Sequence, residues 1–208
     1  MATIILSGFS GAGKDSIAKS LLDLSDRYTF SVSATTRRKR EREADAKNYY
    51  FLTEEEFARK EANGEFLETT VYNGIRYGTL KSEIIRANEA GLDLVMVLDC
   101  PGALHVKAIW PNAITIFIAV PKIAELKTRL KKRGETEKKI EERFALTREE
   151  VLFIPKFDYL VLNEPGKLDE AVQKVHSIAA SAELATEKQL DLVQDLLGQI
   201  EEGEKKNE

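Results

Sequence analysis

The sequence predicts an α/β protein whose central sheet is parallel and carries helices on both faces. Two nearly continuous apolar runs, residues 92–99 and 113–120, are typical of strands that are buried on both sides of a sheet. Segments with apolar residues at helical spacing separate the predicted strands. Strands that alternate with helices favour parallel pairing and a doubly wound arrangement.

Each expected element has a local signal. Strands are predicted at residues 3–6, 30–32, 92–99, 113–120 and 159–162, and helices at 16–24, 54–63, 82–90, 123–132, 138–152 and from 168 onward. Thr53 and Glu56 have the spacing of a capping box, and Gly64 is a helix stop signal. The pair Asn73-Gly74 predicts a hairpin turn.

Bulk composition limits the class of protein. The chain has 208 residues, of which 43% are hydrophobic and 32% charged, which fits one globular domain with an appendage. Its net charge of -4 disfavours general binding to nucleic acid. Cys100 is the only cysteine, and the sequence has neither a signal-peptide pattern nor a run of membrane-spanning length. We therefore expect a cytoplasmic protein without nucleic-acid or membrane partners.

A phosphate-binding signal follows the first predicted strand. The segment GFSGAGKD, residues 8–15, matches the Walker A loop G-x-x-x-x-G-K-[ST] except that Asp15 replaces the hydroxyl residue that ligates Mg²⁺. Backbone N–H groups and the helix N-terminus of such a loop surround a phosphate, and Lys14 compensates charge during phosphoryl transfer. A purely structural glycine turn is the alternative, which the strand, spacing, lysine and helix together disfavour. Because carboxylates are hard oxygen ligands, Asp15 is the predicted metal ligand.

Several separated motifs occur in the order found in guanylate kinases: GFSGAGK, FSVSATTR, KNYYF, NGEFLE, YGT, LDCPGAL and LVLN. From residue 3 to about 180 the sequence resembles this family, which transfers the γ-phosphoryl group of ATP to GMP with Mg²⁺. The resemblance implies a domain of residues 1–180 with a P-loop NTPase-type core, a small mixed NMP-binding part at about 33–91 and a helical lid at about 129–146.

The last segment, residues 181–208, is expected to be a C-terminal helical extension. Its apolar positions include Leu190, Val193, Leu197 and Ile200. We predict that this apolar stripe docks on the domain, with a dimerisation helix as the alternative. The chain is accordingly expected to be a monomer or a homodimer.

The resemblance also implies roles for individual residues. ATP would bind at Gly8, Ser10, Gly11, Ala12, Gly13, Lys14, Asp15, Ser16 and Asn163. GMP would bind at Ser33, Arg37, Arg40, Glu43, Tyr49, Glu68, Tyr77, Thr79 and Asp99. The implied catalytic residues are Lys14, Arg37, Arg133 and Arg143. These residue types suit the chemistry, because arginine forks bind phosphate oxygens and carboxylates accept from the N–H donors of guanine.

The sequence departs from the family pattern at four places. One is Asp15. The loop RRKREREADAK lacks the family's proline and glycines, and the lid segment is one residue shorter than usual. The strand end VLDCPG has Val97 and Pro101 where the family has an acid and a glutamine. Because one acid is gained and another lost in the same predicted metal region, we expect Asp15 to replace the missing carboxylate.

Two other functions remain open from the sequence. Ribose 1,5-bisphosphate phosphokinases resemble guanylate kinases and often carry GKD in this loop, but a sugar phosphate needs no guanine readers such as Glu68, Thr79 and Asp99. Guanylate kinase-like interaction modules usually lack the working phosphate loop, whereas Lys14 and Arg37 are present here.

Overall fold

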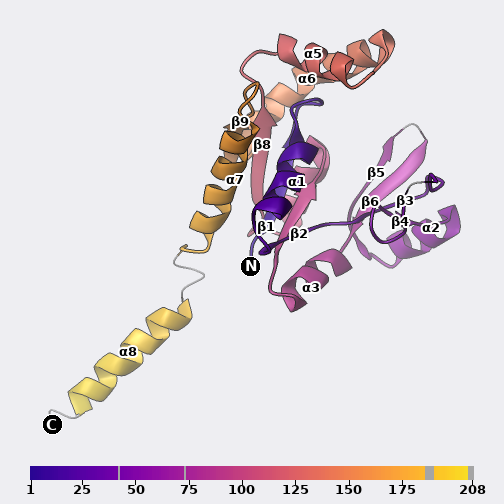
Figure 1. Cartoon of the computed structure of the whole chain (residues 1–208). Helices are drawn as coiled ribbons and strands as arrows, with labels where there is room; N and C mark the ends of the chain where they lie inside the picture. Colours follow the sequence, from indigo (N-terminus) through magenta and orange to yellow (C-terminus); the bar gives the residue numbers. More distant parts are fainter. Residues whose placement is uncertain (42, 73, 186–189, 206–208) are drawn as a thin grey trace.

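A parallel five-stranded sheet forms the centre of the chain in a computed structural model that describes residues 1–41, 43–72, 74–185 and 190–205 (Figure 1). The strand order is β2-β7-β1-β8-β9, and every pairing is parallel, as predicted. The strands are β1 (Thr3–Gly8), β2 (Tyr28–Phe30), β7 (Asp93–Val97), β8 (Ile114–Ala119) and β9 (Tyr159–Leu162).

The second strand is present but lies two residues earlier than the predicted range of 30–32. Strand β2 ends at Phe30, and the next strand, β3 (Ser33–Thr35), belongs to a second sheet. Ser31 and Val32 therefore connect the two sheets. The apolar and β-branched pattern in this stretch does not reveal where the chain leaves one sheet for the other.

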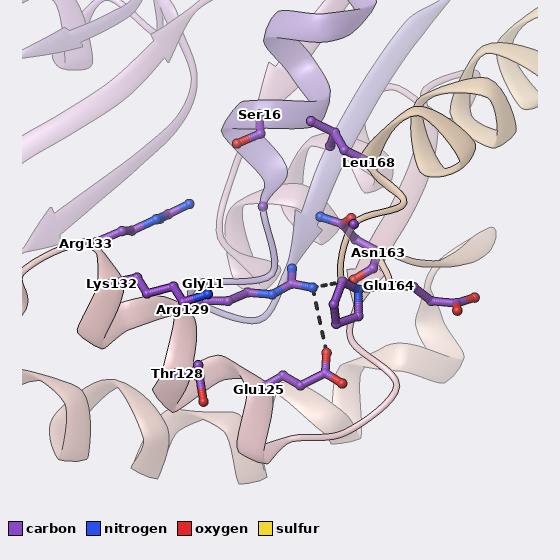
Figure 2. A pocket seen from close by; sticks show the side chains of 13 residues that line it. Gly11, Ser16, Glu125, Thr128, Arg129, Lys132, Arg133, Asn163, Glu164 and Leu168 are labelled. Carbon is purple, nitrogen blue, oxygen red and sulfur yellow. Dashed lines mark hydrogen bonds and ion pairs between the residues drawn. The ribbon is translucent and has the colours of Figure 1, made fainter.

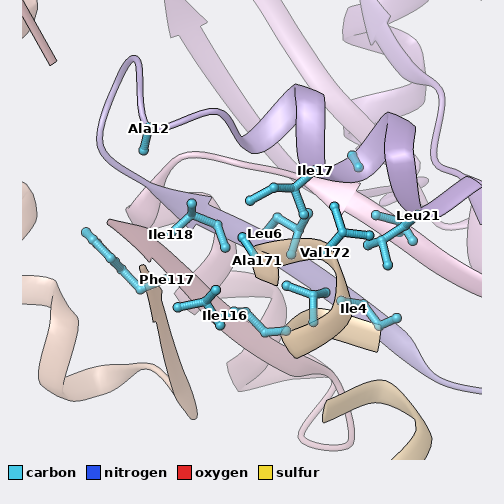
Figure 3. Close-up of a cluster of buried hydrophobic side chains, with 14 of the residues drawn as sticks. Ile4, Leu6, Ala12, Ile17, Leu21, Ile116, Phe117, Ile118, Ala171 and Val172 are labelled. Atoms are coloured by element: carbon cyan, nitrogen blue, oxygen red, sulfur yellow. The ribbon is translucent and has the colours of Figure 1, made fainter. Parts of the chain in front are cut away.

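Helices cover both faces of the parallel sheet, as predicted. They are α1 (Lys14–Leu24) and α7 (Leu168–Ala182) on one face, and α3 (Ser82–Glu89) and α4 (Cys100–Ile109) on the other. Side chains of β1 alternate between the two faces. Ile4 and Leu6 pack with residues of α1 and α7 such as Ile17 and Val172 (Figure 3), whereas Ile5 packs with residues of α3 and α4.

The second sheet is mixed and lies beside the first (Figure 1). Its order is β4-β3-β6-β5, with β4 (Tyr50–Phe51), β5 (Phe66–Tyr72) and β6 (Ile75–Leu80), and β3 pairs parallel with β4 but antiparallel with β6. Tyr72 pairs with Ile75 as a hairpin requires, and Asn73 of the predicted turn lies outside the described residues.

The helix that packs on this mixed sheet begins where the sequence predicts. Helix α2 spans Glu54–Ala62 and follows Thr53. The Thr53 hydroxyl accepts from the Glu56 N–H at 3.1 Å, and the Glu56 carboxylate accepts from the Thr53 N–H at 2.8 Å. This confirms the capping box.

The expected lid helices lie beyond the carboxyl end of β1. They are α5 (Ala124–Lys132) and α6 (Glu137–Phe153), and a short 3-10 turn, Ile154–Lys156, leads from α6 toward β9. Figure 1 shows α5 and α6 together above the end of the parallel sheet. They therefore lie next to the segment that joins β1 to α1.

The prediction that the C-terminal apolar stripe docks on the domain is wrong. Helix α8 (Leu190–Lys205) points away from the sheets in Figure 1. Among its described side chains, Leu190, Leu192, Leu196 and Leu197 are between 49% and 55% exposed. An amphipathic pattern shows that a helix has an apolar face, but not which surface covers it. In the described part of the chain, no helix has both the length and the apolar character needed to cross a bilayer.

Phe57 of α2 provides a test of the packing in the mixed sheet. Its side chain is fully buried and stacks on Phe66 with ring centroids 4.4 Å apart. We expect Phe57→Ala to lower the free energy of unfolding by about 3–5 kcal/mol, because it removes a large buried ring. The exposed Phe30 provides a control. Phe30→Ala is expected to change the free energy of unfolding by less than ~1 kcal/mol. Urea unfolding measures both, and equal effects would contradict this account of the core.

Candidate functional site

The loop between β1 and α1 follows a path that its glycines permit. Gly8 has φ of 124°, and a Cβ there would lie 2.1 Å from the Ile118 carbonyl oxygen of β8. Gly13, at the start of α1, has φ of 98°, and a Cβ there would lie 2.4 Å from Nδ2 of Asn163. Neither a side chain nor an ordinary backbone conformation fits at these two positions. The sequence pattern of the phosphate loop therefore forms a tight turn against β8 and against Asn163, the residue that follows β9.

Lys14 folds back over this loop. Its Nζ donates to the carbonyl oxygens of Gly8 and Phe9 at 2.6 and 3.1 Å. Burial lowers the pKa of Lys14, and the negative charges of Glu150 and Asp15 partly offset that effect. The ammonium group is therefore held at the loop by backbone carbonyls, close to where the loop N–H groups would bind a phosphate.

The carbonyl oxygen of Ala12 accepts two hydrogen bonds from distant segments. Asn163, which follows β9, donates from Nδ2 at 2.7 Å, and Arg129 of α5 donates at 3.1 Å. Arg129 also donates to the Asn163 carbonyl at 2.7 Å. A peptide unit is planar and trans, so its N–H points away from its C=O. Holding the Ala12 carbonyl therefore fixes the direction of the Gly13 N–H.

We call these hydrogen bonds from Asn163 and Arg129 to the Ala12 carbonyl the Ala12 clamp. A cavity of about 400 Å³ opens beside it (Figure 2). The phosphate loop, α5 and the connection from β9 to α7 enclose it. Its lining residues are Gly11, Gly13, Ser16, Glu125, Thr128, Arg129, Lys132, Arg133, Asn163, Glu164, Pro165, Gly166 and Leu168. Five of the predicted residues thus meet here: Gly11, Gly13, Ser16, Arg133 and Asn163. Arg129, which lies one helical turn before Arg133, was not among the residues predicted from the sequence.

Helix α6 contacts the loop from the other side. Arg143 donates to the Ser10 hydroxyl at 2.7 Å and forms an ion pair with Glu135 at 3.3 Å. Burial raises the pKa of Glu150, also on α6, whereas the nearby Lys14 charge lowers it. No local signal in the sequence marks Glu150, because Lys14 and Ser10, which act on it, lie more than a hundred positions earlier in the chain.

The predicted metal ligand lies at the start of α1. Asp15 is exposed in the first helical turn, and Val97 is half-buried at the end of β7. Within residues that the structure describes, no group of three or more His, Cys, Asp or Glu side chains could hold a metal ion. A single carboxylate still fits Mg²⁺, which proteins often bind through one or two carboxylates together with substrate phosphates.

A second cavity, of about 420 Å³, lies between the two sheets and brings several predicted acceptor residues together. Its lining residues are Ser33, Tyr49, Glu68, Thr70, Val71, Tyr77, Gly78, Val97, Leu98 and Asp99. Thr79 lies next to it and donates from its hydroxyl to the Glu68 carboxylate at 2.7 Å. Asp99 is the N-cap residue that precedes α4, and its carboxylate accepts from the Gly102 N–H at 2.8 Å.

These two carboxylates have distinct environments. Burial raises the pKa of Glu68, the hydrogen bond from Thr79 opposes this, and the Asp99 charge raises the pKa further. Asp99 is exposed at the cavity edge. Two carboxylates with free acceptor capacity on one cavity wall are suited to a ligand with adjacent N–H donors.

Arg37 is oriented by a carboxylate. Its guanidinium group donates to both oxygens of Glu43 at 3.0 and 2.7 Å, and the Arg40 backbone N–H donates to Glu43 at 2.8 Å. The Arg37 hydrogen bonds lower the pKa of Glu43 to about 2. Arg37 also lies over the rings of Tyr49 and Phe51 at 5.4 and 5.6 Å. The Arg40 side chain is exposed, so the fold fixes its backbone but leaves its guanidinium in solvent.

Comparison with known proteins agrees with this geometry. The guanylate kinase family profile matches residues 1–182. The chain belongs to the guanylate kinase family. It is 44% identical to a guanylate kinase of Thermotoga maritima over 85% of each chain, and 40% identical to one of Caldanaerobacter subterraneus over 91% of each. A crystal structure of guanylate kinase from Anaplasma phagocytophilum has a TM-score of 0.67 and 26% identity, covering 86% of this chain and 85% of that one. The family resemblance drawn from the motifs is thus confirmed.

The Ala12 clamp predicts a change in loop mobility. Asn163→Ala removes the Nδ2 donor and opens space beside Gly13. We expect amide hydrogen exchange in residues 9–14 to accelerate at least ~10-fold, since local opening would no longer break a buried hydrogen bond worth about 1.5 kcal/mol. Asn112→Ala, a substitution at an exposed asparagine, is the control. Unchanged exchange in Asn163→Ala would contradict the clamp.

Proposed function

We propose that this chain transfers the γ-phosphoryl group of ATP to GMP and releases ADP and GDP. One observation carries the proposal: a cavity lined by Glu68 and Asp99 lies near a phosphate loop that bears Lys14. The loop suits a polyphosphate, and the carboxylates suit a base with adjacent N–H donors. The named relatives, each a guanylate kinase, support the same reading.

The acceptor base is selected by hydrogen-bond direction. Guanine presents N1–H and the N2 amino group, and Glu68 and Asp99 supply acceptors for them. The Thr79 hydroxyl bonds Glu68 at 2.7 Å, which fixes the carboxylate before the base arrives. Adenine has an acceptor at N1 and would leave a carboxylate facing a lone pair. A site built in this way rejects the wrong base strongly, because its buried polar groups would be left unpaired.

The acceptor phosphate binds at the neighbouring cations and hydroxyls. Arg37 has donors beyond those that bond Glu43, and Arg40 extends an exposed guanidinium nearby. Tyr49 and Tyr77 line the cavity with rings 6.1 Å apart and add neutral donors. Ser33 completes the wall toward the base. Arginine forks fit phosphate oxygens in pairs, so this group orients the attacking oxygen.

The donor nucleotide occupies the phosphate loop and the cavity of Figure 2. The residues proposed to bind ATP are Gly8, Ser10, Gly11, Ala12, Gly13, Lys14, Asp15, Ser16 and Asn163. Asp15 and the phosphate oxygens would hold Mg²⁺, which when bound neutralises charge on the phosphates. Asn163 acts mainly on the loop, because its side-chain amide is bonded to Ala12.

In the chemical step, a GMP phosphate oxygen attacks the γ-phosphorus while the bond from that phosphorus to the β–γ bridging oxygen breaks. Lys14 and the lid arginines Arg133 and Arg143 stabilise charge on the moving group, and Arg37 does so on the acceptor side. Closure of α5 and α6 over the phosphates excludes water and limits ATP hydrolysis. The chain thus contributes position and charge, with no covalent intermediate.

Neither alternative from the sequence is favoured. A ribose 1,5-bisphosphate phosphokinase would have no use for the hydrogen-bonded pair of Glu68 and Thr79. An interaction module would not need Lys14 hydrogen-bonded to the carbonyls of a phosphate loop. The relatives, which match this chain over most of their length, are also named guanylate kinase.

An ADP-release assay with MgATP tests the proposal directly. The acceptors are GMP, dGMP, AMP, CMP, UMP and ribose 1,5-bisphosphate. We expect turnover with GMP that is lost in Lys14→Ala and kept in Lys19→Ala, which alters an exposed lysine on the same helix. Turnover only with the sugar phosphate would replace guanylate kinase activity with the alternative kinase. No turnover by folded protein that binds GMP would favour the interaction module.

Acidification is predicted to weaken GMP binding through Glu68. Its pKa is raised, so the carboxylate gains a proton at a higher pH than the ordinary value of 4.5 would give, and a protonated oxygen no longer accepts from guanine. Glu43, with a pKa of about 2, stays ionised throughout this range. We expect the KM for GMP to rise as pH falls from 7 to about 5. The GMP phosphate also gains a proton in this range, so the test is the difference between variants: Glu68→Gln should have a higher KM that rises less on acidification than the wild-type KM does. Equal rises in the two proteins would contradict this assignment.

Replacement of the missing acid by Asp15 gives a separate prediction. We expect Asp15→Ser to lower kcat about tenfold at limiting Mg²⁺, with partial recovery at high Mg²⁺, because one charged ligand is removed. Asp23→Ser, at an exposed position on α1, is the matched control. A magnesium titration of the rate measures both. Full or increased activity in Asp15→Ser would show that Asp15 does not compensate for Val97.

A further inference from the structure

Glu83, in the first turn of α3, is a buried carboxylate outside the predicted site. It is 1% exposed and accepts from the Val32 backbone N–H at 2.7 Å and from the Tyr50 hydroxyl at 2.9 Å. Arg86, one turn later, pairs with it at 2.9 Å. Burial raises the pKa of Tyr50, and the hydrogen bond to Glu83 adds to this, so the hydroxyl stays a donor at neutral pH. The buried charge is thus well paired.

The cluster lies where the chain crosses between the two sheets. Ser31 and Val32 form the first crossing, from β2 to β3, and Lys81 forms the second, from β6 to α3. The Glu83 carboxylate accepts a hydrogen bond from Val32 in the first crossing, and Glu83 lies two residues after Lys81 in the second. Arg86 donates to the Phe30 carbonyl oxygen at 2.9 Å and to the Thr29 hydroxyl at 3.1 Å. Both crossings are therefore tied to the same turn of α3.

The residues that Glu83 bonds are direct neighbours of acceptor-cavity residues. Val32 precedes Ser33, and Tyr50 follows Tyr49; Ser33 and Tyr49 both line the cavity. Side chains alternate along a strand, so Tyr50 points to the opposite side, where it packs on the cluster that contains Phe57. Glu83 thus holds the Val32 backbone directly and the Tyr50 segment through its side-chain hydroxyl, behind the face that these segments present to the cavity.

We propose that Glu83 is a positioning residue for the acceptor nucleotide, which it serves by fixing Ser33 and Tyr49 relative to the parallel sheet. The inference rests on the proposed function, because it assigns the cavity to GMP. Binding groups must be held within a fraction of an ångström by supporting residues, and a small misplacement costs much of their effect. The phosphate loop and donor cavity lie on other elements and do not depend on Glu83.

Steady-state kinetics of two variants test this role. Glu83→Gln cannot accept all of the hydrogen bonds of the carboxylate, and Tyr50→Phe removes one hydroxyl only. For each we expect the KM for GMP to rise about tenfold, with kcat within about twofold and the KM for ATP unchanged. In the double variant, the KM for GMP should rise by less than the product of the two single effects, because both substitutions act on one hydrogen bond. Glu89→Gln on the same helix and Tyr159→Phe on β9 alter exposed residues and serve as controls.

The outcomes separate positioning from general support of the fold. Thermal unfolding is measured for every variant. A selective rise in the KM for GMP in Tyr50→Phe supports the proposal even if Glu83→Gln does not fold. Loss of stability with an unchanged KM for GMP, or equal changes for both substrates, would overturn it. If the wild type turns over GMP and the variants match it, this inference alone is overturned; if the wild type neither binds nor turns over GMP, the proposed function is overturned with it.

Discussion

The hydrogen bonds to the carbonyl oxygen of Ala12 hold the phosphate loop in one conformation. A loop that contains Gly8, Gly11 and Gly13 has few side chains of its own to fix it, and all three glycines have positive φ. Asn163 and Arg129 supply the missing constraint from segments more than a hundred residues away. The peptide unit that joins Ala12 to Gly13 is therefore held in one orientation, which under the proposed function lowers the reorganisation required when a phosphate binds.

The site also has to keep several cations beside several carboxylates without every cation being neutralised by an ion pair. Each cation is held by a specific partner: Lys14 by loop carbonyls, Arg37 by Glu43, and Arg143 by Ser10 and Glu135. These partners leave further donors free on each group. Fixed donors in a partly buried site stabilise a phosphoryl group more than mobile ones in water do.

Local signals in the sequence predicted much of this arrangement. The apolar runs of β7 and β8, the Thr53 capping box and the glycine–lysine loop each depend on neighbouring residues, so they could be read directly. The residues that support the site could not. Arg129, Glu150 and Glu83 have partners that lie from 33 to 140 positions away, and nothing in the local pattern distinguishes them from solvent-exposed charges. The change of sheet after Phe30 and the exposed face of α8 were missed because both depend on tertiary contacts.

A crystal structure of the chain with GMP, Mg²⁺ and a non-hydrolysable ATP analogue would test the account most directly. We expect the guanine to contact Glu68 and Asp99 and the GMP phosphate to contact Arg37 and Tyr49. The polyphosphate of the analogue should lie along residues 8–15, with the Ala12 carbonyl still bonded to Asn163. GMP bound elsewhere, or a guanine that contacts neither carboxylate, would contradict it.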